Sequence, residues 1–483
     1  MNIILLSGGS GKRLWPLSND IRSKQFIKMF KNKEGELESM VQRVYRQITK
    51  VDAEASVTIA TSKKQVSAIK NQLGDSVNVC VEPDRRDTFP AICLAAAYLH
   101  DEKGVGEEEP VVVCPVDPYV EDSYFEALKE LAELAAKGGA NLSLMGIEPT
   151  YPSEKYGYII PEKAENVGQA PWSKEQEDKA CEDQFQEARD PQKQVQENKA
   201  PWSNVYENKA RVSMVSTFKE KPDVPTAESY IAQGALWNGG VFAFKLGYLL
   251  KRAHELIEFK DYWDLFRGYS NLDKISFDYA VVEKESSIQV LRYSGEWKDL
   301  GTWNTFAEAM EEPTLGKAIL NQTCENVNVV NELNIPVLCM GCRDMVVAAS
   351  GDGILIADKE QSSYIKPFVD EMEQQVMYAE KSWGSFTVLD VQDDSMTIKI
   401  ILLPGHKLHY HAHEHRDEVW TIMSGQGRTI VDGMEQPVHP GDVITMAAGC
   451  KHTIIADTEL KVIEVQLGEN ITVEDKQKFD EEY

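Results

Sequence analysis

The residues best suited to chemistry at the start of the chain form a glycine-rich loop with basic side chains. The loop reads Gly8-Gly9-Ser10-Gly11-Lys12-Arg13 and directly follows a short apolar run. Glycines let a backbone turn tightly and present its N–H groups to an anion, and the two cations add charge. The loop lacks the Gly-Lys-Ser/Thr ending of a Walker A motif. Taken alone, it also suits a simple strand-to-helix turn.

More basic residues follow at positions that would end strands. Lys24 comes after a polar stretch, and Arg85 and Arg86 follow Glu82 at the end of another apolar run. The carboxyl ends of parallel strands share one crevice, so we expect these cations to converge there. In a chain with a net charge of −27, such a cluster predicts a phosphate-bearing substrate.

Two isolated aspartates offer oxygen ligands for a hard cation. Asp117 follows the apolar run Val111–Cys114, and Asp299 lies after Trp297 in a strand-turn block. Mg²⁺ is typically held by one or two carboxylates together with substrate phosphates. Taken alone, either aspartate would more often be a helix cap or a turn residue.

A histidine cluster near the end of the chain predicts a second metal site. Five of the nine histidines lie in one short segment. On a strand, His411 and His413 point to the same face, because side chains alternate with a period of two. Such imidazoles, together with a carboxylate, suit Zn²⁺, Fe²⁺, Mn²⁺ or Ni²⁺.

Short strands and amphipathic helices must position these residues. The strand candidates are Ile3–Leu6, Val57–Ala60, Val77–Val81 and Val111–Cys114, and the helix candidates are Glu38–Thr49 and Phe125–Ala136. Strands that alternate with helices predict an α/β domain with a mostly parallel sheet covered on both faces.

Length and composition narrow the possible classes of protein and of binding partner. A chain of 483 residues suggests about three domains. The excess of 78 acidic over 51 basic residues disfavours nucleic acid and anionic lipid as partners. We expect no membrane contact, because no apolar run approaches the roughly 20 residues that cross a bilayer. Eight scattered cysteines predict reduced thiols in a cytoplasmic protein rather than a disulfide framework.

The chain divides into three expected domains. Residues 1–312 form the α/β domain, with a polar surface insertion at 162–211 that repeats Ala-Pro-Trp-Ser and is partly helical around Lys174–Arg189. Residues 313–375 form a small β-rich linker domain. Residues 376–483 carry closely spaced short strands with Gly and Pro turns, which predict a small β-barrel or sandwich.

The order of these blocks resembles the sugar-phosphate nucleotidyltransferases. The loop continues as Arg13-Leu14-Trp15-Pro16-Leu17-Ser18, which is similar to the GDP-mannose pyrophosphorylase branch. Further similar blocks follow in order: Lys24–Phe26, Glu82–Ile92, Pro115–Asp117, Gly146–Thr150, Tyr156–Ile159, Phe218–Pro222, Trp237–Phe242, Phe277–Ala280 and Trp297–Trp303. The resemblance implies a Rossmann-like nucleotidyltransferase domain that joins a sugar 1-phosphate to a nucleoside triphosphate and releases pyrophosphate.

The same resemblance implies roles for individual residues. Asp117 and Asp299 would hold Mg²⁺, Arg13 and Lys24 would screen the triphosphate, and these four are the implied catalytic residues. The implied nucleotide-binding residues are Leu6, Gly8, Gly9, Ser10, Gly11, Lys12, Arg13, Lys24, Glu82, Arg86 and Pro115. The implied sugar-phosphate residues are Gly146, Glu220, Lys221 and Asn238, with Lys221 on the phosphate. Departures from the family pattern at Lys12, Asp87 and Glu154-Lys155 leave the base and the sugar open.

The C-terminal region resembles the cupin domain of bifunctional mannose-1-phosphate guanylyltransferase/mannose-6-phosphate isomerases. Gly405-x5-His411-x-His413-x4-Glu418-x6-Gly425 matches the first cupin motif, and Gly441-x5-Ala447-x-Gly449-x2-His452 matches the second. The implied metal ligands are His411, His413, Glu418 and His452, for a divalent transition metal such as Zn²⁺. Lys478 stands where that family has an arginine implicated in isomerisation. A metal-stabilised regulatory or oligomerisation module therefore stays open beside an isomerase.

These observations lead to one expected function with stated alternatives. We expect a cytoplasmic enzyme, a homo-oligomer and specifically a dimer, that makes GDP-mannose from GTP and mannose 1-phosphate. The alternatives are another nucleoside triphosphate or sugar 1-phosphate, and an added interconversion of mannose 6-phosphate and fructose 6-phosphate in the cupin domain.

Overall fold

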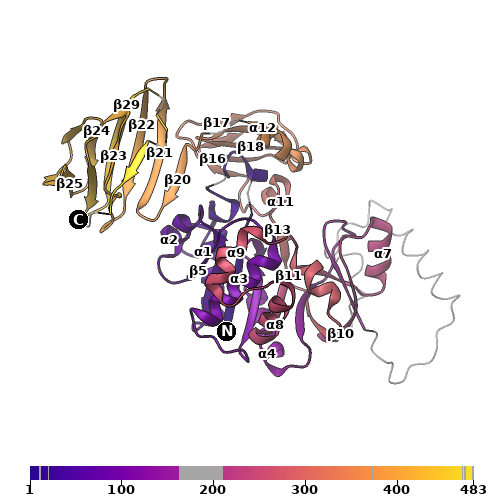
Figure 1. The fold of residues 1–483 in the computed structure, drawn as a ribbon. Coiled ribbons are helices and arrows are strands. Elements are labelled where there is room, and N and C mark those ends of the chain that lie inside the picture. The colour runs from indigo at the N-terminus through magenta and orange to yellow at the C-terminus, as the bar shows by residue number, and fades with distance from the viewer. Residues whose placement is uncertain are drawn as a thin grey trace, which may run out of the picture.

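The computed structural model describes residues 1–9, 12–19, 21–162, 210–372, 375–469, 471–472 and 475–480. These residues form an α/β domain, a small β-rich linker domain that packs against it, and a C-terminal barrel beside the linker domain (Figure 1). Most of the expected polar insertion, including its helix around 174–189, lies outside the described residues.

A nine-stranded sheet runs through the α/β domain in the order β5-β4-β1-β6-β11-β8-β12-β10-β9. Its strands are β1 (Asn2–Ser7), β4 (Ser56–Ser62), β5 (Asn78–Glu82), β6 (Pro110–Pro115), β8 (Leu142–Ile147), β9 (Tyr158–Pro161), β10 (Val212–Lys219), β11 (Leu236–Lys245) and β12 (Ile288–Tyr293). The four strands predicted from apolar runs are therefore present as β1, β4, β5 and β6.

The sheet is mostly parallel, as expected, but two of its nine strands, β11 and β10, run in the opposite direction. Strands β5, β4, β1 and β6 are parallel, and so are β8 and β12. Strand β11 runs antiparallel to both β6 and β8, and β10 runs antiparallel to β9 and β12. An apolar run predicts a buried strand but carries no information about its direction.

Helices cover both faces of this sheet, and each face has its own apolar core. The helices are α1 (Met40–Val51), α2 (Val66–Leu73), α3 (Thr88–Asp101), α4 (Asp122–Lys137), α7 (Val224–Ala232), α8 (Leu246–Leu256), α9 (Tyr262–Gly268), α10 (Phe277–Ala280) and α11 (Trp303–Glu308). One core contains Val44 of α1 and Leu128 of α4, and the other contains Leu94 of α3 and Leu249 of α8. Because helices cover both faces of the sheet, the predicted α/β architecture is confirmed.

The first predicted helix begins two residues later than expected. Residues Leu37–Ser39 form β3, which pairs with β2 (Lys28–Lys31), and α1 starts at Met40. Ser39 caps the helix, because its side chain accepts from the Gln42 N–H and the Gln42 side chain accepts from the Ser39 N–H. The second predicted helix lies within α4.

The linker domain is built from short strands and one short helix. Its elements are β14 (Thr314–Gly316), β15 (Ala318–Leu320), β16 (Asn328–Asn331), β17 (Val337–Cys339), β18 (Met345–Ser350), β19 (Gly353–Asp358), the 3₁₀ turn η5 (Gln361–Tyr364) and α12 (Lys366–Glu371). Strands β14, β16, β18 and β19 form one sheet, and β15 pairs with β17. Its buried residues Val330 and Val346 belong to the same apolar core as Leu17 of the α/β domain.

Two facing sheets form the C-terminal barrel. One contains β20 (Tyr378–Lys381), β21 (Gly384–Val391), β22 (Ser395–Leu402), β29 (Leu460–Gly468), β24 (Arg416–Ser424) and β27 (Val443–Met446). The other contains β26 (Met434–Val438), β25 (Gly427–Val431), β28 (His452–Ala456), β23 (His411–His413) and β30 (Lys476–Lys478). The structure thus confirms the predicted β-rich C-terminal region. No helix among the described residues has the length and apolar character needed to cross a membrane.

Candidate active site and metal centre

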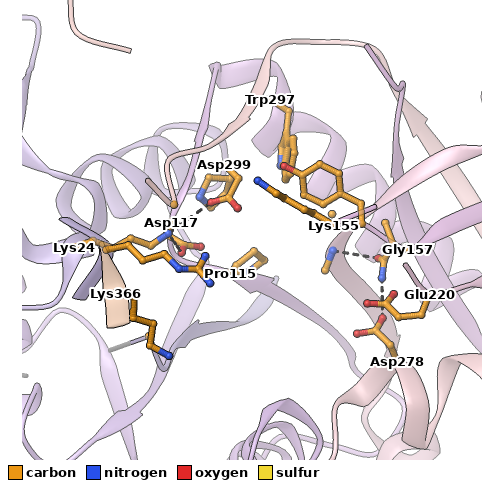
Figure 2. Close-up of a pocket in the computed structure, with 18 of the residues that line it drawn as sticks. Lys24, Pro115, Asp117, Lys155, Gly157, Glu220, Asp278, Trp297, Asp299 and Lys366 are labelled. Carbon is orange, nitrogen blue, oxygen red and sulfur yellow. Dashed lines mark hydrogen bonds and ion pairs between the residues drawn. The ribbon is translucent and has the colours of Figure 1, made fainter. Parts of the chain in front are cut away.

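A cavity of about 470 Å³ opens at the carboxyl end of the central strands of the α/β domain. It is lined by residues from the start, the middle and the end of this domain, and by one residue of the linker domain: Gly9, Lys12, Arg13, Lys24, Pro115, Asp117, Pro118, Lys155, Tyr156, Gly157, Glu220, Asn238, Gly239, Gly240, Asp278, Trp297, Asp299, Gly301 and Lys366. Figure 2 shows two groups of charged side chains in this pocket, with Lys24, Asp117 and Asp299 on one side and Glu220 and Asp278 on the other. The predicted convergence therefore occurs for Lys12, Arg13 and Lys24, whereas Arg85 and Arg86 do not line the cavity.

The first group contains both candidate metal-ligating aspartates and one lysine. Asp117 follows β6, and the short antiparallel pair of β7 (Pro118–Val120) and β13 (Trp297–Asp299) brings Asp299 beside it. The Lys24 ammonium lies 2.7 Å from an Asp117 oxygen and 3.6 Å from an Asp299 oxygen. Burial lowers the pKa of Lys24, but the two carboxylates outweigh burial, so this pKa is raised and the lysine stays charged. One cation thus sits between two carboxylates that remain partly exposed to the cavity.

The glycine-rich loop lies beside this group. Gly8 and Gly9 follow β1, and the Ser23 hydroxyl donates to the Gly9 carbonyl at 3.0 Å. Lys12 and Arg13 begin the short turn η1 (Lys12–Leu14) and line the cavity. Ser10 and Gly11 lie outside the described residues. The loop therefore adds two cations to the same end of the pocket as Lys24.

The other end of the pocket is rich in hydrogen-bond acceptors. The Asn238 amide donates to Asp278 at 2.7 Å, and Lys221 pairs with Glu220 at 2.7 Å. Burial, and after it the neighbouring Glu220 carboxylate, raise the pKa of Asp278 to about 6. The buried Glu220 Oε2 has no hydrogen-bond partner among the described residues. A Cβ on Gly157 would lie 2.4 Å from this oxygen, so the backbone there leaves room for the carboxylate. Free acceptors of this kind suit sugar hydroxyls.

Some predicted binding residues do not line the cavity. Glu82 ends β5 and accepts from the Tyr269 hydroxyl at 2.9 Å, and burial raises its pKa. Arg86 pairs with Asp84 and donates to the Ser270 carbonyl. The members of the predicted set that lie outside the cavity lining are Leu6, Gly8, Glu82, Arg86, Gly146 and Lys221.

Gly146 has a packing role that the sequence did not suggest. It lies in β8 opposite Asn238 of β11, and a Cβ there would approach a Leu236 side-chain carbon to 2.5 Å. The absence of a side chain therefore lets β8 pack closely against its neighbour, which positions Asn238 at the pocket.

The structure adds pocket residues that sequence reasoning missed. Lys155, Tyr156, Asp278 and Trp297 all line the cavity, and each lies inside or next to a block that was used only as a signature. The alternation of charged and aromatic residues in those blocks was an available signal. Lys366 had no such signal, because it lies in the linker domain and reaches the pocket only through the tertiary fold.

The barrel contains the predicted histidine and glutamate set as a single buried cluster. Candidate ligand atoms of His411, His413, Glu418 and His452 all lie within 4.8 Å of one another. Each of the four residues is at most 2% exposed. Glu418 lies 2.9 Å from His413 Nε2 and 3.1 Å from His452 Nε2. Strand pairing places His411 opposite His452 and supports this arrangement.

Hydrogen bonds to the imidazoles indicate that a cation belongs in this cluster. The Nδ1 atoms of His411 and His452 lie 2.6 and 2.9 Å from the carbonyls of His409 and Cys450, so both must donate there. His452 Nε2 then faces a carboxylate oxygen, which requires either a proton or a metal ion between them. Burial lowers the pKa of His411 to about 2, which keeps this imidazole neutral and able to bind a metal. Burial raises the pKa of Glu418, but hydrogen bonds with His413 and His452 outweigh it and lower this pKa. The residues therefore fit a divalent ion.

Two family models match separate parts of the chain. A model described as Nucleotidyl transferase matches residues 2–170 and 204–314, and one described as Mannose-6-phosphate isomerase C-terminal matches residues 369–481. The first match omits 171–203, inside the expected insertion.

Similar proteins cover nearly the whole chain. A mannose-1-phosphate guanylyltransferase from Escherichia coli (strain K12) is 26% identical over 99% of this chain and 98% of its own. The xanthan biosynthesis protein XanB from Xanthomonas campestris pv. campestris is 27% identical over 99% and 98%. A crystal structure of a mannose-1-phosphate geranyltransferase from Thermus thermophilus has a TM-score of 0.56, is 24% identical, and covers 76% of this chain and 98% of that one. This last similarity supports the fold.

Proposed function

The chain belongs to the nucleotidyl transferase family, and from that premise we propose that it is a mannose-1-phosphate guanylyltransferase. It would convert GTP and α-D-mannose 1-phosphate to GDP-mannose and pyrophosphate. The observation that carries this proposal is the arrangement of the pocket. Cations and the end of the glycine-rich loop line one end, hydrogen-bond acceptors line the other end, and two aspartates lie between them. The names of the full-length relatives support the choice of substrates.

For this reaction the chain has to position the two substrates and neutralise the charge of their phosphates. It does not need to supply a covalent nucleophile. An oxygen of the sugar phosphate attacks the α-phosphorus of the nucleotide, and pyrophosphate leaves on the opposite side. Glu220, Asp278 and Asn238 would hold the sugar hydroxyls, and Lys221 beside Glu220 would approach the sugar phosphate. Arg13 and Lys24 would neutralise charge on the triphosphate.

Asp117 and Asp299 would hold a divalent cation, for which we propose Mg²⁺. Two carboxylates that converge beside phosphate-binding cations are the oxygen ligands that Mg²⁺ prefers. The ion would supply electrostatic relief for the charge that accumulates on the phosphate oxygens. The chain's contribution is to fix both carboxylates at strand ends and to keep Lys24 charged between them.

A substrate panel tests the base and the sugar. Purified full-length protein with Mg²⁺ would receive GTP, ATP, CTP or UTP together with mannose, glucose or fucose 1-phosphate. Pyrophosphate release should be at least tenfold faster for GTP with mannose 1-phosphate than for any other pair. A faster pair would replace these substrates, and no release from any pair would reject the transferase.

The barrel supports a second candidate activity. Its match to the isomerase C-terminal model and its buried ligand set favour isomerisation of mannose 6-phosphate and fructose 6-phosphate with a bound transition metal such as Zn²⁺. Full-length protein loaded with Zn²⁺, Mn²⁺, Fe²⁺ or Ni²⁺ should interconvert the two sugars, and His413→Ala should abolish this while Asp117→Ala should not. Absence of isomerisation with all four metals favours a non-catalytic, metal-stabilised regulatory or oligomerisation module.

The assembly and compartment are further parts of the proposal. We propose a homodimer in the cytoplasm that contacts neither membrane nor nucleic acid. The cysteines in the described residues are all free thiols, which suits a reducing compartment. Light scattering coupled to size-exclusion chromatography should give twice the mass of one chain, and a monomer mass would reject the dimer.

A further inference from the structure

The linker domain places a cation inside the pocket of the α/β domain. Lys366 is the first residue of α12 and lines the same cavity as the glycine-rich loop residues Gly9, Lys12 and Arg13. Figure 2 shows it on the side of the pocket where Lys24 lies. The Lys366 ammonium has no ion pair or hydrogen bond within the part of the chain that the structure describes, although the chain as a whole carries a net charge of −27.

The position of Lys366 is determined by buried neighbours on its own helix. Ile365 and Val369 are 9% and 3% exposed and belong to the same apolar core as Leu14 and Leu17. Lys366 itself is exposed to the cavity. Since Ile365 and Val369 secure α12 against the segment after the glycine-rich loop, the backbone of Lys366 is held at the rim of the pocket.

Polar contacts hold the same segment against the linker domain. Asp370 of α12 pairs with Lys12 at 2.8 Å. The Ser350 hydroxyl donates to the Pro16 carbonyl at 2.7 Å, and the contact is buried. Three further bonds follow: the Asn19 amide donates to Asp352 at 2.7 Å, and Arg22 donates to the two oxygens of Glu332 at 2.7 and 2.8 Å.

These contacts make the phosphate-binding end of the pocket a structure shared by two domains. Bidentate arginine–carboxylate pairs and buried hydrogen bonds hold geometry better than isolated surface pairs. Lys12 and the segment that follows it therefore share an interface with the domain that carries Lys366.

We propose that Lys366 binds the pyrophosphate portion of the nucleotide, so that the linker domain completes the triphosphate site. This inference rests on the proposed nucleotidyl transfer and adds a residue to it. Lys366 lies on the side of the pocket where Lys24 lies, away from Glu220 and Asp278, which we assign to the sugar. A lysine ammonium acts on a phosphate as a compact point charge, which suits a group that must also leave.

The test measures binding of inorganic pyrophosphate to the full-length protein by calorimetry with Mg²⁺. Lys366→Gln should weaken binding about tenfold, and Lys366→Arg should stay within about threefold of the original protein. Lys251→Gln is the matched control, since Lys251 is exposed on α8 outside the cavity and its loss changes the net charge equally. It should bind as the original protein does. Lys366→Gln binding within twofold of the control would overturn the inference.

Kinetics separate this inference from the proposed function. Lys366→Gln should raise the KM for the nucleoside triphosphate more than the KM for the sugar 1-phosphate, whichever pair the substrate panel selects. An equal rise in both would overturn the role assigned to Lys366. If no pair releases pyrophosphate, the proposed function fails, while weakened pyrophosphate binding in Lys366→Gln would still support a phosphate site that includes the linker domain.

Discussion

The pocket of the α/β domain and the centre of the barrel both bring carboxylates together with basic groups, but they differ in access. In the pocket, the side chains of Asp117 and Asp299 are 33% and 47% exposed, and both contact Lys24. In the barrel, the side chains of Glu418 and His413 are each 2% exposed. A partly open site suits large anionic substrates that enter and leave at each turnover. Buried ligands suit an ion that stays bound between turnovers.

The two sites also differ in how their residues are assembled. The barrel ligands lie within a stretch of about forty residues: His411 and His413 of β23 and His452 of β28 come from one pair of strands, and Glu418 of β24 comes from the facing sheet. The pocket draws on segments from Gly9 to Lys366 and needs the contact between two domains. The comparison predicts that changes in one site leave the other intact, and that the pocket is the more sensitive to changes at a distance.

The largest expected effect comes from a substitution that disrupts the proposed metal site of the pocket and leaves the barrel intact. Asp299→Asn removes a charge that a divalent cation needs, so kcat for nucleotidyl transfer should fall on the order of 10³-fold. Glu296→Gln is the control, because Glu296 lies just before the same strand and pairs with Lys298 outside the cavity. Steady-state pyrophosphate release measures both variants. A loss of less than tenfold in Asp299→Asn would contradict the metal assignment.

The converse change breaks the barrel centre while sparing the pocket. His413→Ala removes one of four buried ligands, so bound transition metal should fall from about one ion per chain to nearly none, as measured by elemental analysis. His415→Ala, at an exposed histidine two residues away, should keep its metal. Transferase activity should stay within about twofold in both. Full metal content in His413→Ala would disprove the site.

A change at the domain interface should act on the pocket from a distance. Gly353 has φ +152, and a Cβ there would lie 2.4 Å from the Trp15 ring. Gly353→Ala should lower the free energy of unfolding by about 1–3 kcal/mol and raise the KM for the nucleotide severalfold, because Trp15 follows the glycine-rich loop. Gly268→Ala, where a Cβ meets nothing within 4 Å, is the control. Chemical denaturation and kinetics measure the effects; an unchanged KM would argue against coupling through the linker domain.

The smallest expected effect is a pH-dependent gain in stability on substitution of Asp278, at the acceptor-rich end of the pocket. Asp278 has a pKa of about 6 in the folded protein, above its usual value near 4, so the folded state holds the proton more tightly. Its contribution to stability is therefore full below pH 4 and is lost as the pH rises through 6. Asp278→Asn should raise the melting temperature by a few degrees at pH 8 and leave it unchanged at pH 4.

The control for this last prediction is Asp273→Asn, at an exposed aspartate outside the cavity. It should leave the melting temperature unchanged at both pH values. An equal shift at pH 8 and pH 4 for Asp278→Asn would show that burial does not raise this pKa.

Local patterns in the sequence were sufficient to predict some of these structural features. Continuous apolar runs predicted β1, β4, β5 and β6, because strands covered on both faces must be apolar throughout. The cupin-like spacing of His411, His413, Glu418 and His452 predicted a cluster that the structure brings together. Alternation along one strand accounts only for the shared face of His411 and His413.

Other features depend on contacts that no local pattern encodes. The reversal of β11 and β10 within the sheet was missed, since strand direction follows from the path of the chain. The place of Asp278 in the pocket was not predicted, because its role depends on burial beside Glu220. Lys366 reaches the cavity through the packing of Ile365 and Val369 on the α/β domain, more than 300 residues after the loop that it faces.

The most direct test of the account is pyrophosphate release by the full-length protein with GTP, mannose 1-phosphate and Mg²⁺, compared with its Asp117→Ala variant. The account predicts turnover that depends on Mg²⁺ in the original protein and a loss on the order of 10³-fold in the variant, with an unchanged circular-dichroism spectrum. Turnover in Asp117→Ala close to that of the original protein would contradict it.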